Sequence, residues 1–259
     1  MKILAVGDVV GKAGCEFLRK KLPGIKKLWG VDVTVVNGEN SAEGNGVTPF
    51  SADYIFDSGA DVITGGNHTF RRREIYDYFD RSPFLLRPAN FPTDAPGGGL
   101  CVVDRGSYRA AVINIMGQAY MSPILESPFE TADRLIKEAD SEGCKIKIVD
   151  FHAEATGEKL SLAHYLDGRV TAVLGTHTHV PTADLKIMKN GTAYISDLGM
   201  TGPEDSVLGV KPELTVAMMK DKLPVRFLTA EGDCFLCGVL LEADKATGKA
   251  TSVEQIIIR

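Results

Sequence analysis

The sequence has few cysteines and no long apolar run. Its five cysteines are odd in number and scattered, which does not suit a disulfide framework, so we expect reduced thiols. No apolar stretch approaches the roughly 18 residues that a membrane-spanning helix needs. The apolar stretch at residues 1–8 is too short for the core of a signal peptide. We therefore expect a cytoplasmic protein with no membrane partner.

The chain also lacks an excess of positive charge. Its 29 Lys and Arg residues are outnumbered by 34 Asp and Glu residues, which gives a net charge of −5. This balance argues against a protein bound mainly to a nucleic-acid backbone and leaves a small charged ligand open. The 44% hydrophobic and 24% charged composition excludes disordered and collagen-like architectures. A length of 259 residues without internal repeats predicts one domain, spanning residues 1–259.

Strand-like and helix-like segments alternate along the first two thirds of the chain. Segments with helical character lie at residues 14–28, 72–79 and 128–142. Short runs rich in β-branched residues predict strands at residues 2–6, 32–36, 61–64, 110–115, 145–150 and 170–174. This alternation predicts a layered α/β sandwich.

The last third of the chain changes character. Four strand-like runs follow one another with short turns instead of helices, at residues 192–196, 224–229, 234–242 and 252–258. This pattern predicts an antiparallel portion of the sheet or a second sheet. Two loops rich in Pro and Gly, at residues 87–99 and 199–211, are candidates for the walls of a site.

Side chains that can bind metal ions follow five of the predicted strands. In open α/β sheets, ligands bind beyond the carboxyl ends of parallel strands, which is where this pattern places these side chains. They comprise carboxylates, amides and imidazoles: Asp8, Glu39, Asn40, Asn67, His68, His152, His177 and His179.

Histidine is concentrated at these strand ends. Only His164, within a helix-like segment, lies elsewhere, and we expect it to be structural. His177 and His179 point to the same side if their backbone is extended. On a turn leaving the strand they diverge toward two neighbouring ions.

Seven of these residues, all except His68, are candidate ligands of oxygen and nitrogen type. That number exceeds the four of a tetrahedral site and suits two ions about 3.5 to 4 Å apart. The residues alone leave open whether the site is dinuclear or mononuclear. Because no cysteine lies at a strand end, the donor set favours Fe, Mn, Zn or a similar metal over a thiolate site.

The ordered motifs resemble those of the calcineurin-like metallophosphoesterases, and more closely those of the YmdB-like family. The motifs are Gly7-Asp8, Gly38-Glu39-Asn40, Gly66-Asn67-His68, Phe151-His152 and Gly175-Thr176-His177-Thr178-His179. Val10 replaces a histidine of the general pattern, Glu39 replaces a bridging aspartate, and Thr69 replaces an acidic residue. These departures are the ones that distinguish the YmdB-like branch.

The resemblance implies a fold, a ligand set and an activity. The fold is a four-layer αββα sandwich, and the activity is hydrolysis of cyclic nucleotides, 2′,3′-cyclic and also 3′,5′-cyclic ones, by in-line attack of a hydroxide shared by two ions. Those two cofactor ions are expected to be Fe or Mn, with Zn as a further candidate. In the implied set, Glu39 bridges the two ions and His68 is the general acid. One ion is held by Asp8, Asn40 and His179. The other ion is held by Asn67, His152 and His177.

Other functions stay open from the sequence. The same chemistry suits a phosphomonoesterase or nucleotidase, and a metal-containing regulator that binds a nucleotide or RNA with little turnover is a third reading. Residues 71–73 are three arginines flanked by aromatic residues, which suggests an RNA surface, although helical spacing favours a solvated helix. A homo-oligomer is compatible with this size of enzyme.

Overall fold

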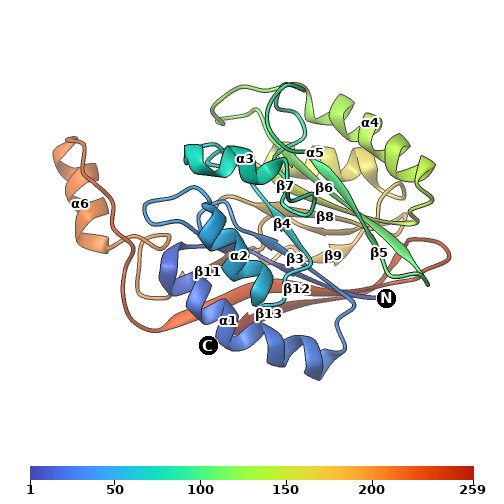
Figure 1. The fold of residues 1–259 in the computed structure, drawn as a ribbon, viewed down its shortest axis with the longest axis horizontal. Helices are drawn as coiled ribbons and strands as arrows, with labels where there is room; N and C mark the ends of the chain where they lie inside the picture. Colours follow the sequence, from blue (N-terminus) through green and yellow to red (C-terminus); the bar gives the residue numbers. More distant parts are fainter.

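The computed structural model describes all 259 residues and contains two β-sheets stacked between helices (Figure 1). The first sheet has the strand order β2-β11-β12-β1-β3-β4, with β13 paired to β12. Strands β1, β3 and β4 run parallel to one another, as do β2 and β11, whereas β12 is antiparallel to its three neighbours β1, β11 and β13. Its strands are β1 (Lys2–Val6), β2 (Asp8–Val9), β3 (Val33–Asn37), β4 (Val62–Thr64), β11 (Met200–Pro203), β12 (Cys234–Ala243) and β13 (Ala250–Ile258).

The second sheet has six strands in the order β5-β6-β7-β8-β10-β9. Its four central strands are parallel, and the two edge strands are antiparallel to their neighbours. Its strands are β5 (Leu100–Asp104), β6 (Arg109–Met116), β7 (Ile146–His152), β8 (Ala172–Thr176), β9 (Lys186–Ile187) and β10 (Ala193–Ile195).

Helices cover the outer face of each sheet and complete four layers (Figure 1). The first sheet carries α1 (Gly11–Trp29), α2 (Pro49–Asp57) and α3 (Tyr76–Phe79), the last preceded by a 3₁₀ turn at Arg73–Ile75. The second sheet carries α4 (Pro128–Ser141) and α5 (Thr156–Leu166). A sixth helix, α6 (Pro212–Asp221), projects from the body at the end of a long connection (Figure 1). No helix is both long and apolar enough to cross a membrane.

Three hydrophobic layers hold this sandwich together, and strand alternation assigns side chains to them. In β1, Ile3 and Ala5 pack between the two sheets, whereas Leu4 and Val6 pack beneath the helices. In β7, Ile148 faces the other sheet and Phe151 faces α4 and α5. Burial on both faces explains why these strands are continuously apolar.

The predicted strands and helices are confirmed in all but one case. Residues 224–229 were expected to form a strand, and that prediction is wrong: only Thr229 makes a bridge, to Val210. Most of this segment is exposed, and Pro224 has no N–H with which to pair. The helices α2 and α6 and the strand β5 were not anticipated. The predicted 199–211 loop contains β11, which completes the antiparallel pairing with β12.

A buried ion pair fixes α5 to the end of the second sheet. Lys159 Nζ lies 2.9 Å from Asp197 Oδ2, and the two side chains are 2% and 1% exposed. The same ammonium donates to the carbonyl of Thr176, at the end of β8. Asp197 also accepts from the backbone N–H groups of Thr178 and Gly199. The pair therefore positions the turn that follows β8.

We expect Lys159→Met to lower the free energy of unfolding by about 3 to 5 kcal/mol, because it leaves the Asp197 carboxylate buried without its cation. Denaturant titration measures this loss. The matched variant is Lys147→Met, since Lys147 pairs with an Asp140 side chain that is 58% exposed. That change is expected to cost no more than about 1 kcal/mol. Equal effects of the two substitutions would contradict this role of the buried pair.

Candidate metal centre

The eight side chains predicted at strand ends meet at one edge of the sandwich. Strands β1, β3 and β4 of the first sheet and β7 and β8 of the second deliver them from opposite sides. Each of the eight has a polar atom within 3.6 Å of a polar atom of another member: Asp8, Glu39, Asn40, Asn67, His68, His152, His177 and His179. The convergence expected from the sequence is present.

One half of the cluster surrounds the Nε2 atom of His152. This nitrogen lies 3.0 Å from Asn67 Oδ1, 3.1 Å from His177 Nδ1 and 3.3 Å from Glu39 Oε1. His152 is fully buried, and Glu39 is 1% exposed. Donor atoms of Glu39, His152 and His177 all lie within 4.8 Å of one another. Such convergence of imidazole nitrogens with carboxylate and amide oxygens is typical of a transition-metal site.

The other half surrounds the Nε2 atom of His179. This nitrogen lies 3.2 Å from Asn40 Nδ2 and 3.6 Å from Asp8 Oδ1. Asp8 is fully buried, and its Oδ1 atom has no hydrogen-bond partner. A buried carboxylate oxygen without a partner is costly, and a bound cation would satisfy it. The donor set of this half therefore also fits a metal ion.

Glu39 lies between the two halves. Its Oε1 atom is 3.3 Å from His152 Nε2 and accepts a hydrogen bond of 2.9 Å from Asn40 Nδ2. Gly66 makes this approach possible, because a Cβ atom there would collide with the side chains of Glu39 and His152. A carboxylate in this position can contribute one oxygen to each of two ions.

The turn after β8 separates its two histidines. His177 and His179 have φ angles of 104° and 66°, in the left-handed region that residues other than glycine rarely adopt. The backbone is therefore not extended, and the rings diverge: His177 turns toward His152 and His179 toward Asp8. Of the two geometries that the sequence left open, the structure has the turn. Asp8 Oδ2 stabilises it by accepting from the N–H of His177.

A hydrogen-bonded chain behind His152 orients its ring. The hydroxyl of Thr176 donates to Asp150 Oδ1 over 2.6 Å, so its oxygen is left to accept from His152 Nδ1–H over 2.9 Å. This arrangement keeps the Nδ1 proton on the outer side of the ring and directs Nε2 into the cluster. Asp150 is held in turn by Asn37 and Thr64 of the opposite sheet.

The other two rings are anchored in the same way. His177 Nε2 faces the carboxylate of Glu154 at 3.2 Å, and His179 Nδ1 faces the carbonyl oxygen of Leu208 at 3.1 Å. Each ring therefore donates outward and presents its second nitrogen to the centre. These supporting residues were not predicted from the sequence. Only Asp150 had a usable signal, since it lies two residues before His152 and therefore on the same face of β7.

Charge coupling within the cluster is strong. Burial lowers the pKa of His152, but the carboxylates of Glu39 and Asp8 outweigh it and raise this pKa to about 9. Burial and the nearby His152 lower the pKa of His177 to about 4. Burial raises the pKa of Glu39, yet the adjacent imidazoles hold it well below its usual value. The carboxylates are therefore ionised, and positive charge at the centre stabilises them.

Two side chains of the cluster, those of Asn40 and His68, do not direct a free ligand atom toward its centre. The amide of Asn40 presents Nδ2, not Oδ1, to His179, so ligation through its oxygen requires a half-turn of the amide group. His68 lies at the outer rim with its ring 29% exposed. Its Nδ1 contacts Glu39 Oε1 and Asn40 Oδ1 at 3.1 and 3.0 Å, which leaves Nε2 free.

Phe70 and residues of the 87–99 loop have structural roles. Phe70 packs edge to face against Tyr76 and Phe91, with ring centroids 5.4 and 5.1 Å apart, and belongs to the hydrophobic layer beneath the helices of the first sheet. Arg87 is buried and donates to backbone carbonyls of its own loop, including that of Pro88. Asn90 ties the same loop to the end of β6.

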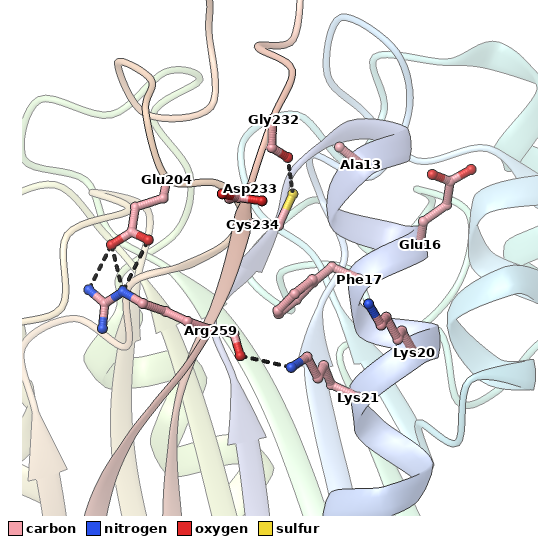
Figure 2. A pocket seen from close by; sticks show the side chains of 10 residues that line it. All are labelled: Ala13, Glu16, Phe17, Lys20, Lys21, Glu204, Gly232, Asp233, Cys234 and Arg259. Carbon is pink, nitrogen blue, oxygen red and sulfur yellow. Dashed lines mark hydrogen bonds and ion pairs between the residues drawn. The ribbon is translucent and has the colours of Figure 1, made fainter.

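A cavity of about 590 Å³ beside α1 and the end of β13 is not part of this centre (Figure 2). None of the eight clustered residues lines it. Two of its three basic side chains are engaged within the protein, since Arg259 pairs with Glu204 and Lys21 donates to the carbonyl of Arg259 (Figure 2). No histidine lines it, so it lacks the imidazole donors that the strand-end cluster contains.

The chain is similar in sequence to a bacterial enzyme and in fold to two solved structures. The enzyme named 2′,3′-cyclic-nucleotide 2′-phosphodiesterase from Bacillus subtilis is 48% identical over 258 residues, covering 100% of this chain and 97% of that enzyme. A solved structure described as a novel phosphatase from Mycoplasma pneumoniae superposes with a TM-score of 0.93 at 35% identity, covering 100% of this chain and 93% of the other. A 5′-nucleotidase precursor from Thermus thermophilus shares the fold alone, with a TM-score of 0.60, 13% identity and coverage of 100% and 54%.

The fold is therefore a four-layer α/β sandwich shared with these phosphatase and nucleotidase structures, with a candidate site for divalent metal at its strand ends. A family model described as YmdB-like protein matches residues 4–256. The chain belongs to the YmdB-like family.

The orientation of His152 generates a test. We expect Thr176→Val to weaken metal affinity by about 10- to 100-fold, since the hydroxyl that holds His152 Nδ1 is lost. Competition with a chromogenic chelator measures the affinity. Thr176→Ser retains the hydroxyl and should bind metal like the wild type. If the valine variant kept full affinity, the chain from Asp150 to His152 would have no role in binding.

Proposed function

We propose that this protein is a metal-dependent phosphodiesterase that hydrolyses 2′,3′-cyclic nucleotides at a dinuclear centre. The observation that carries the proposal is the buried cluster of two connected donor sets with Glu39 between them. The 48% identity to the Bacillus enzyme over the whole chain supports the substrate class.

Seven residues of the cluster would hold the ions. Asp8, Asn40 and His179 would hold one ion, Asn67, His152 and His177 would hold the other, and Glu39 would contribute to both. When bound, the two ions would offset the negative charge of the phosphodiester and lower the pKa of a water molecule. Fe and Mn suit this mixed imidazole, carboxylate and amide set, and Zn is a further candidate.

The protein's own groups position the reaction around this centre. Asp150 and Thr176 hold the His152 ring, and Glu154 holds His177, so the donors are fixed before a substrate binds. The hydrolysis adds water at phosphorus and breaks the bond to the 2′ oxygen, which leaves a 3′-phosphate. The departing 2′ oxygen must receive a proton.

His68 is the residue proposed to deliver that proton. It lies at the exposed rim of the cluster, directly after Asn67 in the chain. Its Nδ1 faces the carboxylate of Glu39, which orients the ring. Its Nε2 makes no hydrogen bond within the protein, so this atom is free to reach a leaving group.

Metal content tests the dinuclear assignment. Elemental analysis of the purified protein, after saturation with Mn and removal of free ions, should find two ions per chain. The Glu39→Gln variant should lose at least one ion together with its activity on 2′,3′-cyclic AMP, because the bridging charge is gone. The matched variant is Glu142→Gln, because the Glu142 side chain lies on the surface and is 51% exposed. This variant should retain both ions and the activity. Full metal content in the Glu39 variant would refute the bridging role.

Substitution of His68 separates proton transfer from metal binding. We expect His68→Ala to keep both ions and to lower turnover by roughly 100-fold or more, as for loss of a general acid. Steady-state kinetics and elemental analysis on the same sample measure the two effects. Loss of an ion from this variant would reassign His68 to the ligand shell.

Phosphomonoester hydrolysis is a second candidate function, because the similar Mycoplasma pneumoniae structure is described as a phosphatase. Bis(p-nitrophenyl) phosphate and p-nitrophenyl phosphate distinguish the two activities under identical metal supply. The proposed diesterase should turn over the diester faster. A strong preference for the monoester would favour the second function.

A further inference from the structure

A groove next to His68 is not used by the proposed chemistry. It encloses about 360 Å³ and is formed by three segments that are distant in sequence. One is the 43–45 loop, which follows Asn40, and one is the turn at residues 71–72, which follows His68. The backbone N–H of Arg71 donates to the carbonyl of His68, so the groove begins one turn from the proposed general acid. The third is the 225–228 segment, which precedes Thr229.

The groove is positively charged. Arg71, Arg72 and Arg226 line it, opposed only by the acidic side chain of Glu43. Arg72 is committed to the protein, because its guanidinium donates to the backbone carbonyls of Asn45 and Glu43 and holds the loop. Arg71 and Arg226 are exposed and make no side-chain hydrogen bond or ion pair in the structure. Two guanidinium groups, from segments far apart in the sequence, are therefore available to a ligand.

The lining favours a nucleotide over a simple inorganic anion. Phe227 is 37% exposed beside Arg226, and Val225 and Leu228 complete an apolar wall. Guanidinium groups bind phosphate oxygens in pairs, and an aromatic ring next to them offers a surface for a base. A substrate whose reacting phosphate occupies the centre, with its leaving group toward His68, would extend into this groove.

We propose that this arginine groove binds a second phosphate of the substrate. The preferred substrates would then be nucleotides that carry both a 2′,3′-cyclic phosphate and a further phosphate. Two sources supply that chemistry: a mononucleotide with a 5′-phosphate, and the 3′ end of a cleaved RNA, where the preceding phosphodiester is the second anion. The inference rests on the proposed function and specifies its substrate class.

Kinetics on three substrates test the groove. We compare kcat/KM for 2′,3′-cyclic AMP, for its 5′-phosphorylated form and for the dinucleotide ApA with a terminal 2′,3′-cyclic phosphate. The wild-type enzyme should prefer at least one of the two doubly charged substrates by roughly tenfold or more, the gain expected for a charge-assisted contact. Which one it prefers identifies the source. The preference should shrink as ionic strength rises.

Substitution of the two free arginines tests whether the groove causes the preference for doubly charged substrates. In the double variant Arg71→Ala, Arg226→Ala, the ratio of the kcat/KM values should fall to near one. Arg81→Ala removes an exposed arginine outside the groove and should leave the ratio unchanged. Inhibition by the product analogue adenosine 3′,5′-bisphosphate, compared with 3′-AMP, should follow the same pattern and reports binding without turnover.

The outcomes separate the two proposals. Hydrolysis of 2′,3′-cyclic AMP with no preference for a second phosphate would overturn the groove assignment and leave the proposed function standing. A preference that survives in the double variant would also overturn it. Failure of the metal-loaded wild-type enzyme to hydrolyse any of the three substrates would instead refute the proposed function and, with it, this inference.

Discussion

Two buried carboxylates, those of Asp8 and Glu39, impose the constraint on which the rest of the site depends. Both are essentially inaccessible to solvent. Negative charge in such surroundings is stable only when opposing charge lies beside it. His152 and His179 approach these carboxylates from neighbouring strand ends. The carboxylates raise the pKa of His152, so its protonated ring supplies positive charge. Bound metal ions would balance the buried negative charge more strongly than a protonated histidine does.

The two-sheet architecture turns this local requirement into a precise geometry. Asp8, Glu39 and Asn67 come from the first sheet, whereas His152 and His177 come from the second. The spacing of the donors is therefore set by how the sheets pack, not by any one loop. Polar links cross the same interface, since Asn37 of β3 donates to Asp150 of β7. Because the interior is close-packed, the ring of His152 has little freedom to move.

Much of the fold and the cluster itself could be predicted from the sequence, because strand periodicity is local and strand ends share one edge. Hydrophobic runs located β1, β3, β7 and β8, and the residues after each run were the ones that converged. The orientation of the rings could not be predicted. Glu154 and Leu208 anchor His177 and His179 through contacts that depend on where distant loops lie, and no periodicity reports that.

The 225–228 segment shows the same limit more sharply. Its composition resembles a strand, yet the structure leaves it outside both sheets, with a backbone hydrogen bond from the N–H of Lys211 to the carbonyl of Leu228, and places it against the 43–45 loop. The proximity of Arg226 and Arg71 is a product of that long-range placement. Sequence spacing carries no signal for it, so a charged groove beside the centre emerged only from the three-dimensional arrangement.

Anomalous diffraction from crystals of the manganese-loaded protein tests the central claim most directly. The account predicts two peaks per chain, one adjoining His152 Nε2 and His177 Nδ1, the other adjoining Asp8 Oδ1 and His179 Nε2, with the Glu39 carboxylate between them. A single peak, or peaks away from these atoms, would contradict it.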